Sequence, residues 1–296
     1  MGCNQCPRKC NKERREDDTA SYGYCKVSVR PKVARAALHF WEEPCISGEE
    51  GSGTVFFSGC NLRCVYCQNR EIAAGVRGKE ISIERLAEIF LELQEKGANN
   101  INLVTPSHYY AQIKEALLLV KEKLHIPVIA NTSSYESVEE LKEMEGLIDI
   151  YLADFKYMSR ELAEKYSHAK DYPQVAAEAL REMFRQLGEP EFDERCMMKK
   201  GIIVRHLLLP GCMEDSKAVL KYLYETYGNS IFISIMNQYT PLSHVGGYPE
   251  LNRRITEEEY EEVVDYAIEL GIENGFVQEG ETAEESFIPA FDGEGV

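Results

Sequence analysis

The densest group of reactive side chains is a set of three thiols within residues 56–69 (FFSGCNLRCVYCQN): Cys60, Cys64 and Cys67. A structural zinc site is closed by four protein ligands, whereas an iron–sulfur cube held by three thiolates leaves one iron open to bind something that reacts. The C-x3-C-x2-C spacing therefore favours a 4Fe–4S cluster. On spacing alone, a zinc site completed by a distant His39 or His108, and a buried group of thiols, remain alternatives.

The elements that must position this loop are read from apolar segments of strand length: 54–58, 100–104, 127–131, 147–155, 201–209 and 231–236. Helix-period segments separate them, one of which follows Ser82 as a cap and stops at Gly97. Alternating strands and helices predict right-handed crossovers and a parallel sheet. Six such units predict an α/β fold, a partial (βα)6 barrel over residues 51–296. A Rossmann sheet is the competing layout, but no G-x-G-x-x-G follows the first strand.

Polar residues at the carboxyl ends of these strands are candidates for a site, because parallel α/β folds bind ligands there. Asp154 and Lys156 stand two residues apart, which aims both into one cavity, although a structural ion pair is the alternative. Arg205 is a charge inside an apolar strand and needs a partner, whereas its neighbour His206 is expected to face the opposite way. Gln238 is a weaker candidate of the same kind.

Residues 1–50 show no strand–helix alternation and are interpreted as a cysteine-rich N-terminal extension. A second set of thiols lies there: Cys3, Cys6, Cys10 and Cys25. Four thiolates can close a site, so zinc, a second iron–sulfur cluster and a metal-free tail are all open. The low apolar content of this segment favours a metal. The remaining scattered cysteines are expected to be apolar fillers or loop residues: Cys45, Cys196 and Cys212.

Composition narrows the partners and the compartment. The 296-residue chain carries a formal charge of −17, which disfavours nucleic acid or an anionic membrane as a partner. No apolar run reaches the roughly 18 residues of a membrane span, and the N-terminus has no apolar signal region. We therefore expect a cytoplasmic protein, in which ten cysteines indicate metal ligands or redox groups.

The motif formed by Cys60, Cys64, Tyr66 and Cys67 resembles the C-x3-C-x-aromatic-C motif of radical S-adenosylmethionine (radical SAM) enzymes. The flanking GCNLRCVYCQN is most similar to the pyruvate formate-lyase-activating-enzyme-like branch, and the resemblance extends through CPRKC, NLVTPSH, DIYLADFKY, VRHLLLPG and NQYTP. It implies an oxidoreductase with a 4Fe–4S cluster and S-adenosylmethionine. An electron from an external flavodoxin- or ferredoxin-like donor then cleaves S-adenosylmethionine, and the resulting 5′-deoxyadenosyl radical removes hydrogen from a substrate.

The resemblance also implies roles for residues around the cofactor. Tyr66 would lie near the adenine, and Asn131 and Thr132 at a position that contacts the ribose or carboxylate. Lys156 would pair with the cofactor carboxylate. Where the family has a G-G-E-like motif for the methionine amino group, this chain has TPSH, so the contact falls to Thr105, Ser107 or His108.

Three functions remain open from the sequence. The first is an activase that takes hydrogen from a glycine of a partner glycyl-radical enzyme, as the resemblance implies. The second is a radical SAM enzyme acting on a small molecule. The third is a non-catalytic iron–sulfur or zinc-binding module, which predicts no S-adenosylmethionine binding and gives no role to the polar residues at the strand ends.

Overall fold

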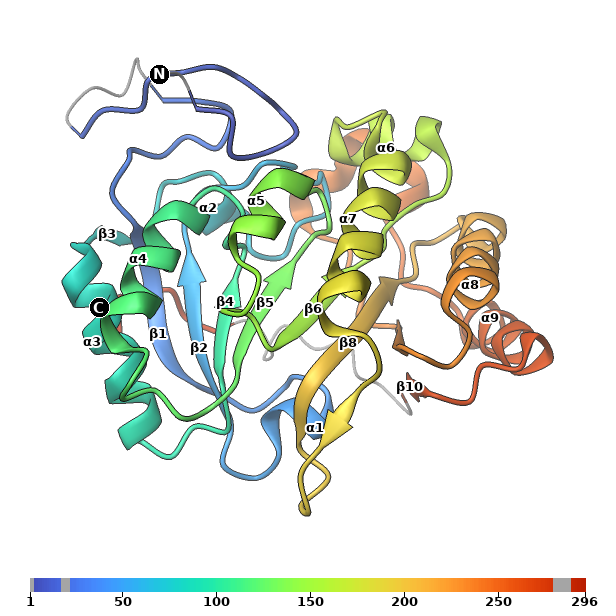
Figure 1. Cartoon of the computed structure of the whole chain (residues 1–296). Coiled ribbons are helices and arrows are strands. Elements are labelled where there is room, and N and C mark those ends of the chain that lie inside the picture. Colours follow the sequence, from blue (N-terminus) through green and yellow to red (C-terminus); the bar gives the residue numbers. More distant parts are fainter. Residues whose placement is uncertain (1–2, 17–21, 279–288) are drawn as a thin grey trace.

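The computed structural model describes residues 3–16, 22–278 and 289–296. In these residues ten strands form one sheet, whose main path runs β10-β9-β8-β6-β5-β4-β2-β1-β3, with β7 pairing β8 from the side (Figure 1). The parallel part comprises β2 (Ser52–Phe57), β4 (Ile101–Val104), β5 (Val128–Thr132), β6 (Ile150–Asp154), β8 (Met198–Leu207), β9 (Phe232–Met236) and β10 (Gly275–Val277). The predicted α/β barrel sheet is confirmed.

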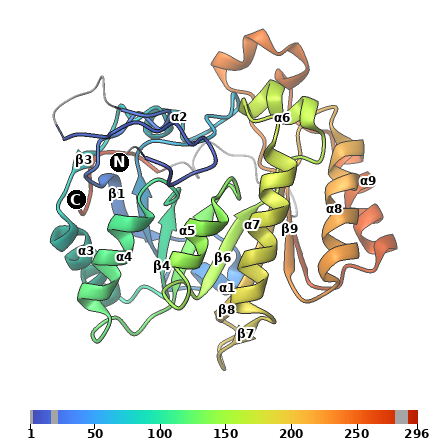
Figure 2. The same cartoon turned by 45° about the horizontal axis from the view of Figure 1, so that its top comes forward.

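Helices cover the outer face of the sheet (Figure 2): α3 (Ile83–Glu95), α4 (Tyr110–Val120), α5 (Val138–Glu143), α7 (Tyr172–Leu187), α8 (Met213–Tyr227) and α9 (Glu257–Leu270). Ser82 caps α3 by accepting from the backbone N–H of Arg85, as the sequence predicts. The largest apolar core lies between this layer and the sheet, for example at Phe90 and Leu180. Shorter helices are α2 (Arg70–Ala73) and α6 (Arg160–Ser167), with 3-10 turns at Ser243–Gly247 and Pro249–Leu251.

The inner face of the sheet has its own apolar floor. Helix α1 (Pro44–Ser47) places Cys45 and Ile46 against Ile129, Ile150 and other inner-facing strand residues. Helix α1 thus covers the end of the barrel at which the parallel strands begin. Polar side chains on the inner face therefore stand above an apolar floor, toward the carboxyl ends of the strands.

The region before residue 51 differs from the sequence-based expectation of a patternless extension. Strand β1 (Lys32–His39) joins the main sheet, antiparallel to β2 and to the short β3 (Lys79–Glu80). The alternation of strand and helix missed it because β1 has no crossover helix. The described residues before β1 form no helix or strand, and they lie over the carboxyl ends of the parallel strands (Figure 1).

Two further elements frame the sheet. The two-residue β7 (Glu191–Phe192) pairs antiparallel with β8. Residues 289–296 return to β1, where the backbone N–H of Ala36 bonds to the carbonyl of Glu294 and that of Gly293 to the carbonyl of Ala34. The C-terminal end thus lies beside β1, several strands away from β10. In the described parts of the chain, none of the helices has the length and apolar character needed to cross a bilayer.

Candidate radical SAM site

The three-cysteine loop leaves the sheet at the carboxyl end of β2 and leads into α2. Gly59 begins it with a φ of +91°, a conformation that glycine adopts without strain. The backbone N–H of Leu62 lies 3.3 Å from the sulfur of Cys60, and the N–H of Asn69 donates to Cys67. Burial raises the pKa of the Cys67 thiol to about 12, so these thiols need a positive centre to become thiolates.

The three sulfurs fit a cluster better than a single ion. In the described part of the chain, no three His, Cys, Asp or Glu side chains converge as ligands of one ion. A four-iron cube is itself wide and separates its thiolate ligands more than one ion does. No fourth cysteine is contributed by the loop, which leaves one iron of such a cluster open. The donor set present therefore fits a 4Fe–4S cluster at Cys60, Cys64 and Cys67.

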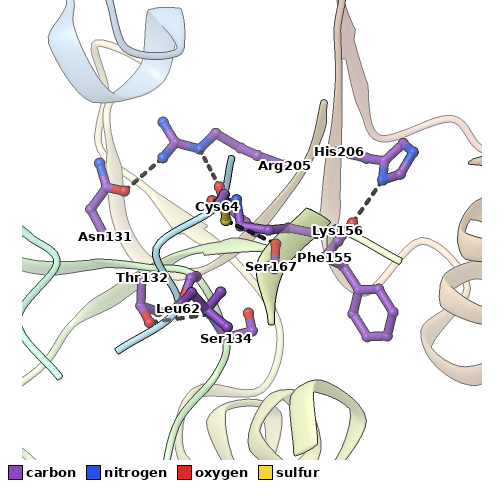
Figure 3. A network of polar contacts seen from close by, with 12 residues as sticks. Leu62, Cys64, Asn131, Thr132, Ser134, Phe155, Lys156, Ser167, Arg205 and His206 are labelled. Atoms are coloured by element: carbon purple, nitrogen blue, oxygen red, sulfur yellow. Dashed lines mark hydrogen bonds and ion pairs between the residues drawn. The ribbon is translucent and has the colours of Figure 1, made fainter. Parts of the chain in front are cut away.

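A chain of hydroxyl groups reaches Cys64 from the helical side of the loop. The hydroxyl of Ser167 lies 2.9 Å from the Cys64 sulfur (Figure 3). Ser167 is linked to the hydroxyl of Tyr157 at 2.9 Å, and Tyr157 to that of Tyr66 at 2.6 Å. Tyr66, expected beside an adenine, is buried and uses its hydroxyl in this chain. Its ring also meets Tyr239 edge to face.

Charged side chains gather on the inner face next to the loop. The Lys156 Nζ lies 2.6 Å from an Asp154 carboxylate oxygen, and the other oxygen is 3.3 Å from Arg205 Nε. Arg205 also bonds to Asn131 at 2.6 Å (Figure 3). A further bond joins Arg205 to Glu42 at 2.9 Å. The strands explain the grouping, because Asp154 and Arg205 are register partners on β6 and β8. The sequence-predicted residues Asn131, Asp154, Lys156 and Arg205 thus form one network.

This network stays charged although it is shielded from water. Burial disfavours the charged forms, but the ion pairs outweigh it: the pKa of Asp154 lies below its ordinary value, and those of Lys156 and Arg205 lie above theirs. The sulfurs of Cys64 and Cys67 also raise the pKa of Lys156, which places its ammonium group close to the loop. A shielded cation beside the cysteine loop suits a carboxylate ligand.

Three other predicted residues have their polar contacts elsewhere. The hydroxyls of Ser107 and Thr132 both donate to Oε1 of the buried Glu136, at 2.5 Å for Ser107. Burial raises the pKa of Glu136 to about 7, although both hydroxyls oppose this shift. His108 is buried, and its Nε2 lies 2.8 Å from the Ser58 carbonyl oxygen. These three side chains support the loop ends rather than the inner face.

The remaining predicted residues occupy the rim. Thr105 has a φ of +59°, an uncommon conformation for a non-glycine residue that is concentrated at functional sites. Gln238 lies in the loop after β9, where its carbonyl accepts from the Gln68 side chain at 3.1 Å. His206 bonds to the Phe155 carbonyl at 2.7 Å, on the far side of the strand from Arg205 (Figure 3).

Three functional candidates were missed by the sequence reasoning: Glu42, Ser167 and Glu136. Glu42 follows β1, in the segment interpreted as an extension, and its side chain is 8% exposed. Ser167 ends α6, a helix that the apolar pattern does not show. Only a buried-charge argument of the kind used for Arg205 predicts that some acidic partner exists, without indicating which one.

The extension carries the four other cysteines predicted as ligands: Cys3, Cys6, Cys10 and Cys25. All four are free thiols, and Cys6 and Cys25 are buried. Burial raises the pKa of Cys6 to about 12, and Cys25 and Cys3 add to that shift. The scattered cysteines behave differently from one another, since Cys45 is a buried filler of the inner floor, Cys212 is partly buried, and Cys196 is exposed.

Comparisons with known proteins concern the family and the fold. The family model of the Radical SAM superfamily matches residues 54–200. An uncharacterized protein of Methanocaldococcus jannaschii is 26% identical over 275 residues, which cover 90% of this chain and 74% of the relative. A second uncharacterized protein of that organism is 22% identical over 160 residues, covering 48% of this chain and 46% of the relative.

Among solved structures, SuiB of Streptococcus suis is similar with a TM-score of 0.51 at 12% identity. The similarity covers 78% of this chain and 49% of SuiB, so the chain spans about half the length of that enzyme. At this identity the likeness concerns the fold alone. Together with the match of residues 54–200 to the family model of the Radical SAM superfamily, it confirms the α/β fold expected from the sequence.

Proposed function

We propose that this protein is a radical SAM enzyme whose cluster is held by Cys60, Cys64 and Cys67. The observation that carries the proposal is the placement of Lys156. Its ammonium group is shielded, paired with Asp154, and close enough to Cys64 and Cys67 to interact with their sulfurs. A non-catalytic cysteine module has no use for a buried cation and its acidic partners beside the thiols.

When bound at the loop, a reduced 4Fe–4S cluster supplies the electron that breaks the S–C5′ bond of S-adenosylmethionine, yielding methionine and a radical that takes hydrogen from the substrate. The chain's own residues orient the cofactor. Lys156 and Arg205 offer cations to its carboxylate, and Thr105 lies at the position of the family's amino-group contact. Asp154 and Glu42 hold these cations in place by ion pairs. The apolar floor excludes water and stray hydrogen donors below.

Binding is tested separately from turnover. The anaerobically reconstituted, dithionite-reduced protein is examined by electron paramagnetic resonance with and without S-adenosylmethionine. Chelation of the open iron changes the cluster signal when the cofactor is added. An unchanged signal at saturating cofactor would contradict the proposed site, whatever the later chemistry.

The proposed enzyme has two alternative substrates: a glycine of a partner protein or a small molecule. The glycyl-radical-activase role, with a partner glycyl-radical enzyme and a flavodoxin- or ferredoxin-like electron donor, rests on the sequence resemblance to the pyruvate formate-lyase-activating branch. It predicts that a partner protein acquires a stable protein radical while 5′-deoxyadenosine forms. The small-molecule alternative predicts that deuterium from a labelled metabolite appears in 5′-deoxyadenosine, with no radical on a partner protein.

A further inference from the structure

We propose that Cys3, Cys6, Cys10 and Cys25 hold a second, thiolate-ligated metal centre, and that this centre fastens the N-terminal extension onto the cluster loop. The proposal goes beyond the radical SAM function and does not require it. The shared chemistry is a thiophilic centre, either zinc or an iron–sulfur cluster, and the experiment below separates the two.

The first argument is that the described part of the extension lacks regular secondary structure of its own. Residues 3–16 and 22–31 contain no helix or strand. The chain nevertheless folds back on itself, because the N–H of Cys3 bonds to the Lys12 carbonyl at 2.8 Å and that of Lys9 to the Cys6 carbonyl at 3.0 Å. Lys9 and Lys26 have φ values of 41° and 62°, which non-glycine residues rarely adopt. An irregular, strained segment without its own apolar core is typical of a metal-stapled fold.

The second argument is that the thiols converge. Cys25 and Cys3 are near enough to Cys6 to interact with it electrostatically, and Cys3 and Cys10 are near enough to Cys25. The Cys10 sulfur lies 2.7 Å from the position that a Cβ on Gly23 would take, so only glycine leaves room for it. Cysteines from both ends of the extension thus lie near one another, and none of them forms a disulfide.

The third argument is a backbone pattern shared with the radical SAM loop. The N–H two residues after Cys6, that of Arg8, donates to the Cys6 sulfur, and the N–H of Val27 donates to Cys25. The same offset occurs at Cys60, where the N–H of Leu62 lies 3.3 Å from the sulfur. Amide groups aimed at a sulfur favour the thiolate, the form that binds metal.

Hydrogen bonds and close backbone contacts join the extension to the cluster loop. A Cβ on Gly59, next to Cys60, would lie 2.7 Å from the Cys25 carbonyl oxygen. Arg8 Nε bonds to the Asn61 carbonyl at 2.8 Å, and another Arg8 nitrogen to the His168 carbonyl at 2.6 Å. The hydroxyl of Tyr24 bonds to the Leu62 carbonyl at 3.1 Å. Residues adjacent to Cys6 and Cys25 therefore hold the backbone of the cluster loop.

Metal analysis of four full-length, anaerobically purified proteins tests the proposal: the wild type, a Cys60/Cys64/Cys67→Ala triple variant, a Cys6→Ser/Cys25→Ser double variant, and Cys196→Ser as an exposed-thiol control. Zinc, iron and sulfide are measured per chain. The triple variant should retain either one zinc or about four irons with sulfide. The double variant should contain less metal than the wild type, by the same one zinc or about four irons. Cys196→Ser should contain as much metal as the wild type.

A folded triple variant without zinc or iron would overturn the proposal, and so would a double variant with the metal content of the wild type. The second comparison decides the question if the triple variant does not fold. These comparisons stay valid even if Cys60, Cys64 and Cys67 hold no cluster. In that case the triple variant would contain as much metal as the wild type. For the fastening role, amide hydrogen exchange of residues 60–68 should quicken at least tenfold in the double variant; unchanged exchange would contradict that role.

Discussion

Two cysteine-bearing segments meet at one end of the barrel, and they are held by different means. The loop at Cys60, Cys64 and Cys67 lies between β2 and α2, so a regular element fixes each of its ends. The described residues before β1 form no helix or strand, and backbone hydrogen bonds and turns define their path. Regular structure thus positions the first segment, whereas the second depends on its contacts with the rest of the chain and, in our proposal, on a metal centre.

The largest effect is expected at the loop itself. Cys64→Ala removes one of three ligands and leaves the barrel intact, because Cys64 is only a peripheral member of the core. We expect loss of the loop's iron and no detectable S-adenosylmethionine cleavage, measured by iron analysis and product chromatography. Cys212→Ala, another partly buried cysteine, should behave as the wild type. Full activity of Cys64→Ala would show that Cys64 is not a ligand of the cluster, and the comparison of the two cysteine segments would fail.

We expect the stability of the folded protein to depend on pH because of a buried carboxyl group near the extension. Glu136 is buried near Cys6, and its pKa is raised from 4.5 to about 7. Between these values the folded carboxyl keeps its proton while the unfolded chain has lost it, so stability is full below 4.5 and falls as the pH rises toward 7, by ~3 kcal/mol in total.

Glu136→Gln removes this titration, so it should be more stable than the wild type at pH 8 by up to ~3 kcal/mol, with the advantage shrinking toward pH 5. Anaerobic urea unfolding at both pH values measures the difference. The exposed Glu115→Gln is the matched control and should show no pH-dependent change. A constant difference between Glu136→Gln and the wild type at the two pH values would show that Glu136 does not titrate as described.

A smaller effect is expected on the inner face. Lys156→Met keeps most of the side-chain volume and removes the cation beside Cys64. Asp154 remains paired with Arg205, so the fold should survive. We expect S-adenosylmethionine affinity to fall roughly tenfold, about 1.4 kcal/mol, with the iron content unchanged. Calorimetric titration measures it, with the surface variant Lys114→Met as control; unchanged affinity would assign Lys156 to the scaffold.

The smallest effect tests the hydroxyl chain. Ser167 donates to the Cys64 sulfur, which favours the more negatively charged, reduced cluster. Ser167→Ala should lower the midpoint potential by roughly 20–60 mV while leaving the iron content intact. A potentiometric titration followed by electron paramagnetic resonance measures the shift. Ser230→Ala, whose hydroxyl bonds to Glu189, should not move the potential. An equal potential in Ser167→Ala and the wild type would remove Ser167 from the cluster's surroundings.

Much of the scaffold was predictable because local chemistry encodes it. Buried apolar runs gave the parallel strands, and Ser82 and Gly97 marked the ends of α3. The antiparallel β1 was missed because no crossover helix joins it to the sheet, and β10 was missed because it has only three residues. Lys156 was predicted from its place at a strand end, two residues after Asp154, and Arg205 from its charge within an apolar strand. The structure joins both residues to Asp154.

The partners of these residues could not be predicted, because tertiary packing selects them. Glu42 reaches Arg205 across 163 residues of sequence, and Ser167 reaches Cys64 across 103. Ser107 and Thr132 end neighbouring strands as expected, but the buried Glu136 attracts both hydroxyls away from the inner face. A strand-end position thus indicates which end of the barrel a residue occupies, and its neighbours decide the direction of its side chain.

The formation of 5′-deoxyadenosine tests the central claim most directly. The wild-type protein is reconstituted anaerobically with iron and sulfide, reduced with dithionite and supplied with S-adenosylmethionine, beside the Cys60/Cys64/Cys67→Ala triple variant. We predict 5′-deoxyadenosine and methionine in equal amounts from the wild type and neither from the variant. A fully reconstituted wild-type protein that leaves S-adenosylmethionine intact, or a triple variant that cleaves it equally well, would contradict the account.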